Sequence, residues 1–195
     1  MPLISRDEAM TKLAQYLKGV PTVFRAAWGR TRKSEQIDLI DQTKTTKANL
    51  MRDYVCGDLT RHWIGNPSVR YVEVGQQSLF IIEQTFAFRI KKLDRASCSS
   101  NYPTDQDQNF RQQGQIDGLP QLHNFELGWV PNATETDVDD VRVVCLNGDR
   151  PYWWQSVERP ADNVYDLFQG QRDPNSPAPT YSPGASEVTI EPKKK

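Results

Sequence analysis

The stretch Thr85–Leu93, with the sequence TFAFRIKKL, decides the fold of this chain. In an extended backbone Phe86, Phe88 and Ile90 point to one side, and the residues between them, which include Arg89, point to the other. Such alternation is typical of a strand that has one face against a hydrophobic core. The stretch therefore predicts a sheet that buries one of its faces.

Shorter alternating runs on either side of this strand predict the other strands. They are Val69–Val74, Leu79–Glu83, Phe125–Trp129, Val141–Cys145 and Tyr152–Trp154. A preferred two-residue hairpin turn, Asn147-Gly148, joins the last two runs. Because no long helical pattern separates the strands, the connections favour an antiparallel meander of about six strands over a parallel sheet.

The first 65 residues have a helical period instead. Ser5 and Glu8 have the spacing of a capping box, which predicts a helix that begins there and ends at Gly19. A second helix is expected over residues 21–33, where proline stands in the first turn. A third is expected over residues 46–63, where apolar side chains recur every three or four positions.

These patterns together predict one α+β domain over residues 1–169. Its helical part, residues 1–65, would pack on one face of the mainly antiparallel sheet of residues 69–157. Residues 170–195 contain five prolines and almost no large apolar side chains, which predicts a disordered tail.

One long polar connection interrupts the predicted sheet. Residues 95–121 are rich in Ser, Asp and Gln, and a short helix capped at Thr104 and anchored by Phe110 is expected within them. A polar connection of this length in a compact domain is either a functional loop or a mobile one.

Charge is unevenly distributed along the chain. Residues 1–95 carry 16 Lys and Arg against 10 Asp and Glu, whereas residues 96–195 carry 8 against 15, for a formal net charge of -1. This division indicates either a basic face for an acidic partner or charges scattered over a solvated surface.

The cysteines and the N-terminus indicate the compartment. Three cysteines lack the even number of a disulfide framework and the paired spacing of a zinc site. The sequence shows neither a signal peptide nor an apolar run of the roughly 20 residues that a membrane helix needs. We therefore expect a cytoplasmic protein with reduced thiols, no membrane contact, no cofactor and no bound metal.

Two basic groups are candidates for nucleic-acid contact. The first surrounds Trp28 and consists of Arg25, Arg30, Arg32 and Lys33, with Lys44 and Lys47 shortly after. Arginines donate to phosphate oxygens, and an adjacent aromatic ring can stack on a base. The alternative is a solvated helix end in which Trp28 is the apolar anchor.

The second basic group lies at the end of the strand 85–93. It consists of Arg89, Lys91, Lys92 and Arg95, and Arg70 would widen it if a neighbouring strand carries that residue. Such a patch could bind a phosphate or an acidic partner. The alternative is a sheet edge that charge protects against aggregation.

Few residues are suited to catalysis. His62 follows Asp58 by four residues on the third helix and is expected to be packed or paired with it, and His123 has no motif partner. No zinc-peptidase, phosphate-loop or nucleophile-elbow motif is present. A metal-dependent nuclease would need Glu73, Glu83 and Asp94 to converge on one end of the sheet.

Several short motifs resemble a known family. They are Phe88–Asp94, Asn101–Thr104, Gly118–Pro120, Thr134–Thr136 and Val141–Leu146. Over residues 69–157 the chain is similar to an uncharacterised bacterial and phage family that lies in mobile elements beside helix-turn-helix repressors and metallopeptidase-like regulators. The resemblance implies a setting, the regulation of mobile elements, and no catalytic residues.

The leading hypothesis is a non-enzymatic regulatory or protein-interaction protein of a bacterial mobile element or phage. Residues 95–121 and the aromatic run Tyr152, Trp153 and Trp154 would contact the partner, because Tyr and Trp dominate interface hot spots. The alternative for the two tryptophans is that one packs in the core and the other covers its edge. A nucleic-acid-binding protein is the second hypothesis, and a metal-dependent nuclease the third. The oligomeric state remains open.

Overall fold

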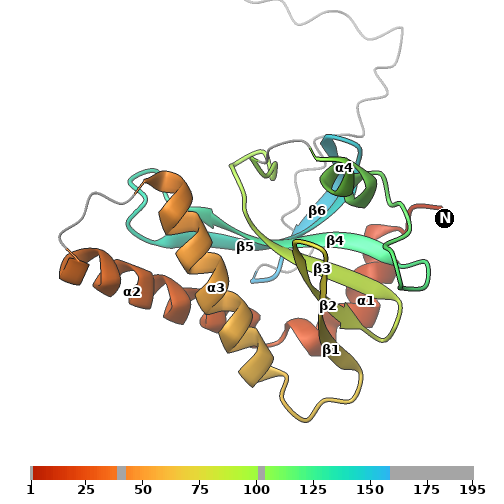
Figure 1. Ribbon diagram of the computed structural model, residues 1–195, viewed down its shortest axis with the longest axis horizontal. Coiled ribbons are helices and arrows are strands. Elements are labelled where there is room, and N and C mark those ends of the chain that lie inside the picture. The colour runs from red at the N-terminus through yellow and green to blue at the C-terminus, as the bar shows by residue number, and fades with distance from the viewer. Residues whose placement is uncertain (1, 39–42, 101–103, 159–195) are drawn as a thin grey trace, which may run out of the picture. The chain divides into compact units, whose positions relative to one another are not determined.

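The computed structural model describes residues 2–38, 43–100 and 104–158, all of which lie in one compact unit (Figure 1). Three helices precede the strands in the chain, and a fourth lies in the connection between the third and fourth strands. They are α1 (Arg6–Leu17), α2 (Val20–Asp38), α3 (Lys44–His62) and α4 (Asp105–Arg111). The strands are β1 (Val69–Val74), β2 (Gln77–Ile82), β3 (Phe86–Lys92), β4 (His123–Pro131), β5 (Val138–Asn147) and β6 (Arg150–Ser156). This confirms the predicted α+β class, while the predicted tail lies outside the described residues.

Helices α1, α2 and α3 cover one face of the sheet. The side chain of Ser5 caps α1 by accepting from the backbone N–H of Glu8 at 3.3 Å, as the capping-box spacing predicts. The buried side of α1 is Ala9, Leu13, Tyr16 and Leu17. These helices and the alternate residues Phe86, Phe88 and Ile90 of β3 belong to one continuous hydrophobic core.

The six strands follow one another across the sheet in chain order, but one neighbouring pair is parallel. Strands β3 and β4 run in the same direction, with Arg89 beside Glu126 and Lys92 beside Trp129, whereas every other pair is antiparallel. The sheet is therefore mainly antiparallel, as predicted, and only this pair departs from the antiparallel meander that the connections favour. The cause is the connection over residues 93–122, which returns along the sheet and allows β4 to start beside the start of β3.

That connection covers the second face of the sheet. Thr104 caps α4 by accepting from the N–H of Asp107 at 3.1 Å, and the α4 residue Phe110 is buried, as the sequence predicts. Phe110 packs with Ile116, Leu122 and the sheet residue Ile81 in a second hydrophobic cluster. The connection is thus a packed layer that gives the sheet two buried faces.

The position of β3 excludes one interpretation of its basic residues. Because β3 lies between β2 and β4, it is an interior strand, and its charges do not protect an exposed edge. Arg70 is on β1, which pairs with β2 rather than with β3. None of the helices in the described part of the chain is long and apolar enough to cross a bilayer.

Gly128 provides a test of the packing between β4 and the connection. A Cβ atom at this position would lie 2.6 Å from the carbonyl oxygen of Lys91 and 2.5 Å from Cγ of Leu93. We expect Gly128→Ala to lower the free energy of unfolding by about 1–3 kcal/mol in urea denaturation, because the backbone of β3 must move.

Gly29 is the matched control, since it lies in α2 and a Cβ atom there meets nothing within 4 Å. We expect Gly29→Ala to raise the free energy of unfolding by about 0.5–1 kcal/mol, through the higher helix propensity of alanine. Equal effects of the two substitutions would contradict the packing described for Gly128.

Candidate functional site

The parallel pair places the ends of two strands at one edge of the sheet. There β3 ends at Lys92 and β4 ends at Pro131, and a cavity of about 800 Å³ lies between these ends and the first half of α3. In Figure 1 this half of α3 lies beside the segment 93–100, and residues of both line the cavity. Ligands of sheets with parallel strands commonly bind at the carboxyl ends of those strands.

A second cavity of about 240 Å³ adjoins the first. The two share the lining residues Lys44, Ala48, Lys92, Trp129 and Glu135. We refer to the larger cavity as the basic groove and to the smaller one as the side cavity.

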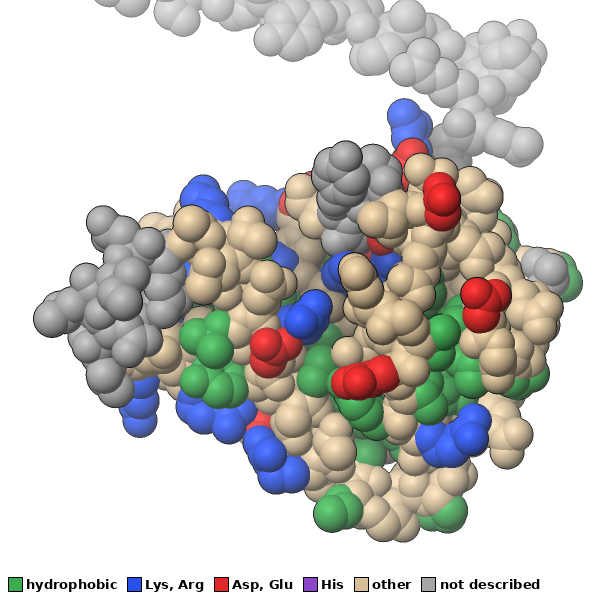
Figure 2. All heavy atoms as spheres, viewed as in Figure 1, with side chains coloured by type: hydrophobic (Ala, Val, Ile, Leu, Met, Phe, Trp, Pro, Cys, Tyr) green, Lys and Arg blue, Asp and Glu red, His purple; other side chains and the backbone are tan. Residues whose placement is uncertain are grey.

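The lining of the two cavities is strongly positive. Seven cationic side chains contribute to it: Arg32, Lys44, Lys47, Arg52, Lys91, Lys92 and Arg95. Only two of the described lining residues, Asp94 and Glu135, are acidic, and Glu135 is paired with Lys92 at 3.2 Å. Figure 2 shows that blue Lys and Arg side chains gather over the helices on the same face. The groove therefore concentrates positive charge in a chain whose net charge is -1.

Lys91 is the most perturbed of these cations. Burial, and after it the positive charge of Arg89, lower the pKa of Lys91 from 10.5 to about 8. Both causes disfavour the ammonium form. An anion bound in the groove would act in the opposite direction by stabilising the charged form.

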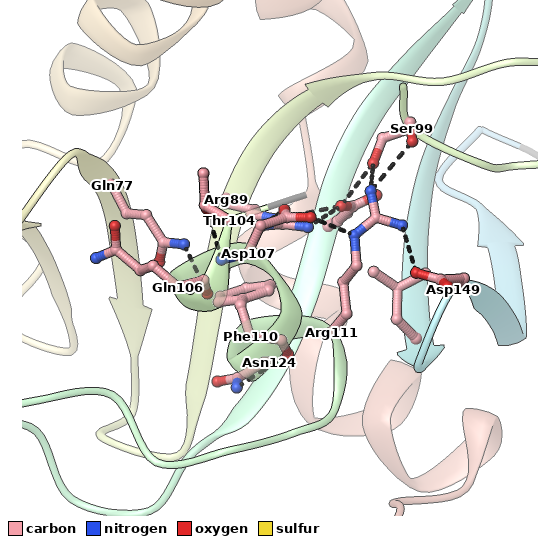
Figure 3. Close-up of polar contacts among 12 residues, drawn as sticks. Gln77, Arg89, Ser99, Thr104, Gln106, Asp107, Phe110, Arg111, Asn124 and Asp149 are labelled. Carbon is pink, nitrogen blue, oxygen red and sulfur yellow. Dashed lines mark hydrogen bonds and ion pairs between the residues drawn. The ribbon is translucent and has the colours of Figure 1, made fainter. Parts of the chain in front are cut away.

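Arg89 precedes Lys91 by two residues and is buried in an ion-pair network between the sheet and α4 (Figure 3). Its Nε and Nη2 donate to one oxygen of Glu126 at 3.0 and 2.6 Å, and its Nη1 donates to Asp107 of α4 at 2.5 Å. The guanidinium also lies over the ring of Phe110, 4.3 Å from its centroid. Parallel pairing makes this possible, because it places Arg89 directly beside Glu126.

The network also holds the segment that forms one wall of the groove. The hydroxyl of Ser99 donates to Glu126 at 2.8 Å, and Arg111 of α4 donates both to that hydroxyl and to the backbone oxygen of Ser99 at 3.1 Å. Arg111 in turn pairs with Asp107 at 2.8 Å. The wall is thus fixed by charge-assisted hydrogen bonds before any ligand arrives.

The structure separates the basic residues predicted around Trp28. Arg25 pairs with Glu158 at 2.6 Å, and Arg30 pairs with Asp58. Lys33 is exposed and lines neither cavity, whereas Arg32 and Trp28 line the side cavity.

Of the second predicted group, Lys91 lines the groove, but Arg89 is buried below it as a structural residue. Three further cations come from α3: Lys44 and Arg52 line the groove, and Lys47 lines the side cavity. The sequence analysis includes Lys44 and Lys47 with the first basic group but does not predict Arg52, because only the fold brings α3 to the ends of β3 and β4. Their one sequence signal is a run of positive residues in the first half of a helix.

The aromatic run in β6 is divided between core and surface. Trp153 packs against the ring of Phe125 at 5.3 Å and donates its indole N–H to the backbone oxygen of Ile4 at 2.9 Å. Trp154 is half-buried under the guanidinium of Arg142, 4.1 Å from its ring centroid. Tyr152 is 49% exposed.

The residues considered for catalysis do not come together. His62 contacts the backbone oxygen of Lys18 rather than Asp58, which corrects the expected Asp58 pairing, and the buried His123 stacks on Phe86. The pairing of β2 with β3 places Glu83 near the start of β3, whereas Asp94 follows the end of β3. These two carboxylates therefore lie at opposite ends of the strand. Within residues 2–38, 43–100 and 104–158, no three His, Cys, Asp or Glu side chains are grouped so as to hold a metal ion.

The three cysteines are free thiols. Burial raises the pKa of Cys56 to about 11 and that of Cys145 to about 12, so both remain protonated at neutral pH. Cys98 lines the groove, and burial raises its pKa as well.

Comparison of the chain with protein-family models, with curated proteins and with solved structures gives no match. The resemblance to a mobile-element family therefore stays a prediction, and the function must be argued from the geometry of the chain itself.

The buried network predicts a large and specific loss of stability on substitution. Arg89→Met leaves the Glu126 carboxylate buried without its cation, so we expect the free energy of unfolding in urea to fall by about 3–5 kcal/mol. The double variant Arg89→Met/Glu126→Met removes both charges and should lose less than Arg89→Met alone. A double variant whose loss equals the sum of the two single losses would contradict a direct pairing of these residues.

Proposed function

We propose that this protein binds nucleic acid through phosphates that lie in the basic groove. The observation that supports the proposal most strongly is the charge of the groove lining: five cations against two acids among the described residues, in a chain with a net charge of -1. A groove with one sign of charge attracts a polyanion, and bound Lys and Arg replace the counterions of its phosphates.

The placement of the cations fits an elongated ligand better than a single small anion. Lys44 and Arg52 are in the first half of α3, Lys91 and Lys92 are at the end of β3, and Arg95 is in the following segment. Positive residues spread along a groove of about 800 Å³ can contact several successive phosphates. A phosphate beside Lys91 would favour its ammonium form, which burial disfavours.

A protein partner, with a role in a mobile element or phage, is the other proposal that the sequence motivates. Its predicted contact surface receives less support from the geometry, because Trp153 is bonded into the core and Trp154 is covered by Arg142. Tyr152 is the exposed member of that run. The basic groove is therefore the better-supported site.

Charge reversal in the groove tests the proposal. Lys44 and Arg95 are exposed, so Lys44→Glu/Arg95→Glu should fold normally. We expect it to weaken binding to a fluorescein-labelled oligonucleotide of about 15 nucleotides at least about tenfold in fluorescence anisotropy. The slope of log affinity against log salt concentration should become shallower by about 1.5, since two phosphate contacts are lost.

Arg70→Glu/Arg150→Glu is the matched control. It makes the same change of net charge at two exposed arginines that do not line the groove. We expect its salt slope to equal that of the unchanged protein. Equal losses in the two double variants would show that net charge, not the groove, governs binding, and no binding at low salt by the unchanged protein would refute the proposal.

A further inference from the structure

The side cavity has two tryptophans in its lining, of which the basic groove shares only Trp129. Trp28 of α2 and Trp129 of β4 both contribute to it, together with the cations Arg32, Lys44 and Lys47. Its volume of about 240 Å³ is about that of eight water molecules at roughly 30 Å³ each, which is too small for a folded chain segment and large enough for one planar ring system.

The walls of the side cavity are held in place by hydrogen bonds. The indole N–H of Trp28 donates to the backbone oxygen of Thr136 at 2.9 Å, which fixes the half-buried ring against the turn between β4 and β5. Within that turn the N–H of Thr136 donates to the side chain of Asn132 at 2.8 Å, and Glu135 adopts a left-handed φ of 52°. The cavity is therefore formed in the unliganded protein.

Trp129 supplies an observation that the fold alone leaves unexplained. It is 1% exposed, and its indole nitrogen has no hydrogen-bond partner among the residues that the structure describes. A buried N–H without an acceptor is unfavourable. Because Trp129 lines both the side cavity and the groove, a ligand that enters there could bring the missing acceptor.

We infer that the side cavity accepts one unpaired base of a single-stranded nucleic acid whose phosphates lie in the basic groove. This inference rests on the proposed function. An unstacked base has both an aromatic face, which the Trp28 ring can contact, and oxygen and nitrogen acceptors on its edge, which can approach the indole N–H of Trp129. The carboxylate of Glu135 also lines the cavity and supplies an acceptor for donors on the edge of the same base.

A duplex cannot use this cavity, because its bases are stacked and paired with each other. Electrostatics alone would favour the duplex, whose phosphates are more densely spaced than those of a single strand. Preference for a single strand is therefore a specific signature of the side cavity.

The test compares three fluorescein-labelled probes of equal length by anisotropy at fixed salt: a single strand, the duplex of the same sequence, and a strand of abasic sites. We expect the unchanged protein to bind the single strand at least about fivefold more tightly than either other probe, the lower limit for one stacked base. The abasic strand and the duplex should still bind with a steep salt dependence, because they retain the phosphates.

Trp28→Leu removes the aromatic face without a change of charge, and Trp28 lines the side cavity but not the groove. We expect this variant to bind the single strand about as weakly as the abasic strand and to leave the affinity for the duplex unchanged. Ala26→Leu, at an exposed position of α2, is the control and should change nothing.

Equal affinity of the unchanged protein for all three probes, with a steep salt dependence, would overturn the base-binding inference and leave the proposed function intact. Absence of binding to every probe would overturn the proposed function itself. The comparison of probes needs no variant, so the inference can be refuted even if Trp28→Leu fails to fold.

Discussion

The buried pair between Arg89 and Glu126 is the interaction on which the rest of this structure depends. It joins the two parallel strands at the centre of the sheet, and through Asp107 it holds α4 against them. Charges buried this deeply are costly unless they are paired and hydrogen-bonded. Ser99 and Arg111 complete the arrangement, so the described parts of the connection, residues 93–100 and 104–122, are held against the sheet.

That path determines where positive charge accumulates. Because β4 starts beside the start of β3, both strands end at the same edge, next to the first turns of α3. Lys91 follows the buried Arg89 by two residues and faces the same low-dielectric surroundings, which lowers its pKa. A structural network beneath the surface and a basic groove above it are thus consequences of one strand pairing.

Much of the fold follows from local patterns, whereas the site does not. The Ser5 cap, the alternation of Phe86, Phe88 and Ile90, and the Thr104 cap are local features, and each predicts its element correctly. Parallel and antiparallel strands share the same two-residue period, so alternation cannot reveal the β3–β4 pairing. Sequence also cannot show that Arg89 is buried, because arginine is mostly exposed and its partner Glu126 is 37 residues away.

The five tryptophan indole N–H groups allow the most direct measurement of where a nucleic acid binds. A ¹H–¹⁵N NMR titration of the full chain with a short single strand would follow all five, with each signal assigned from a Trp→Phe variant. Binding in the groove and side cavity should shift Trp28 and Trp129 and leave Trp63, Trp153 and Trp154 unchanged, because only the first two line these cavities. Larger shifts at Trp153 or Trp154 than at Trp28 and Trp129 would contradict binding at the ends of β3 and β4.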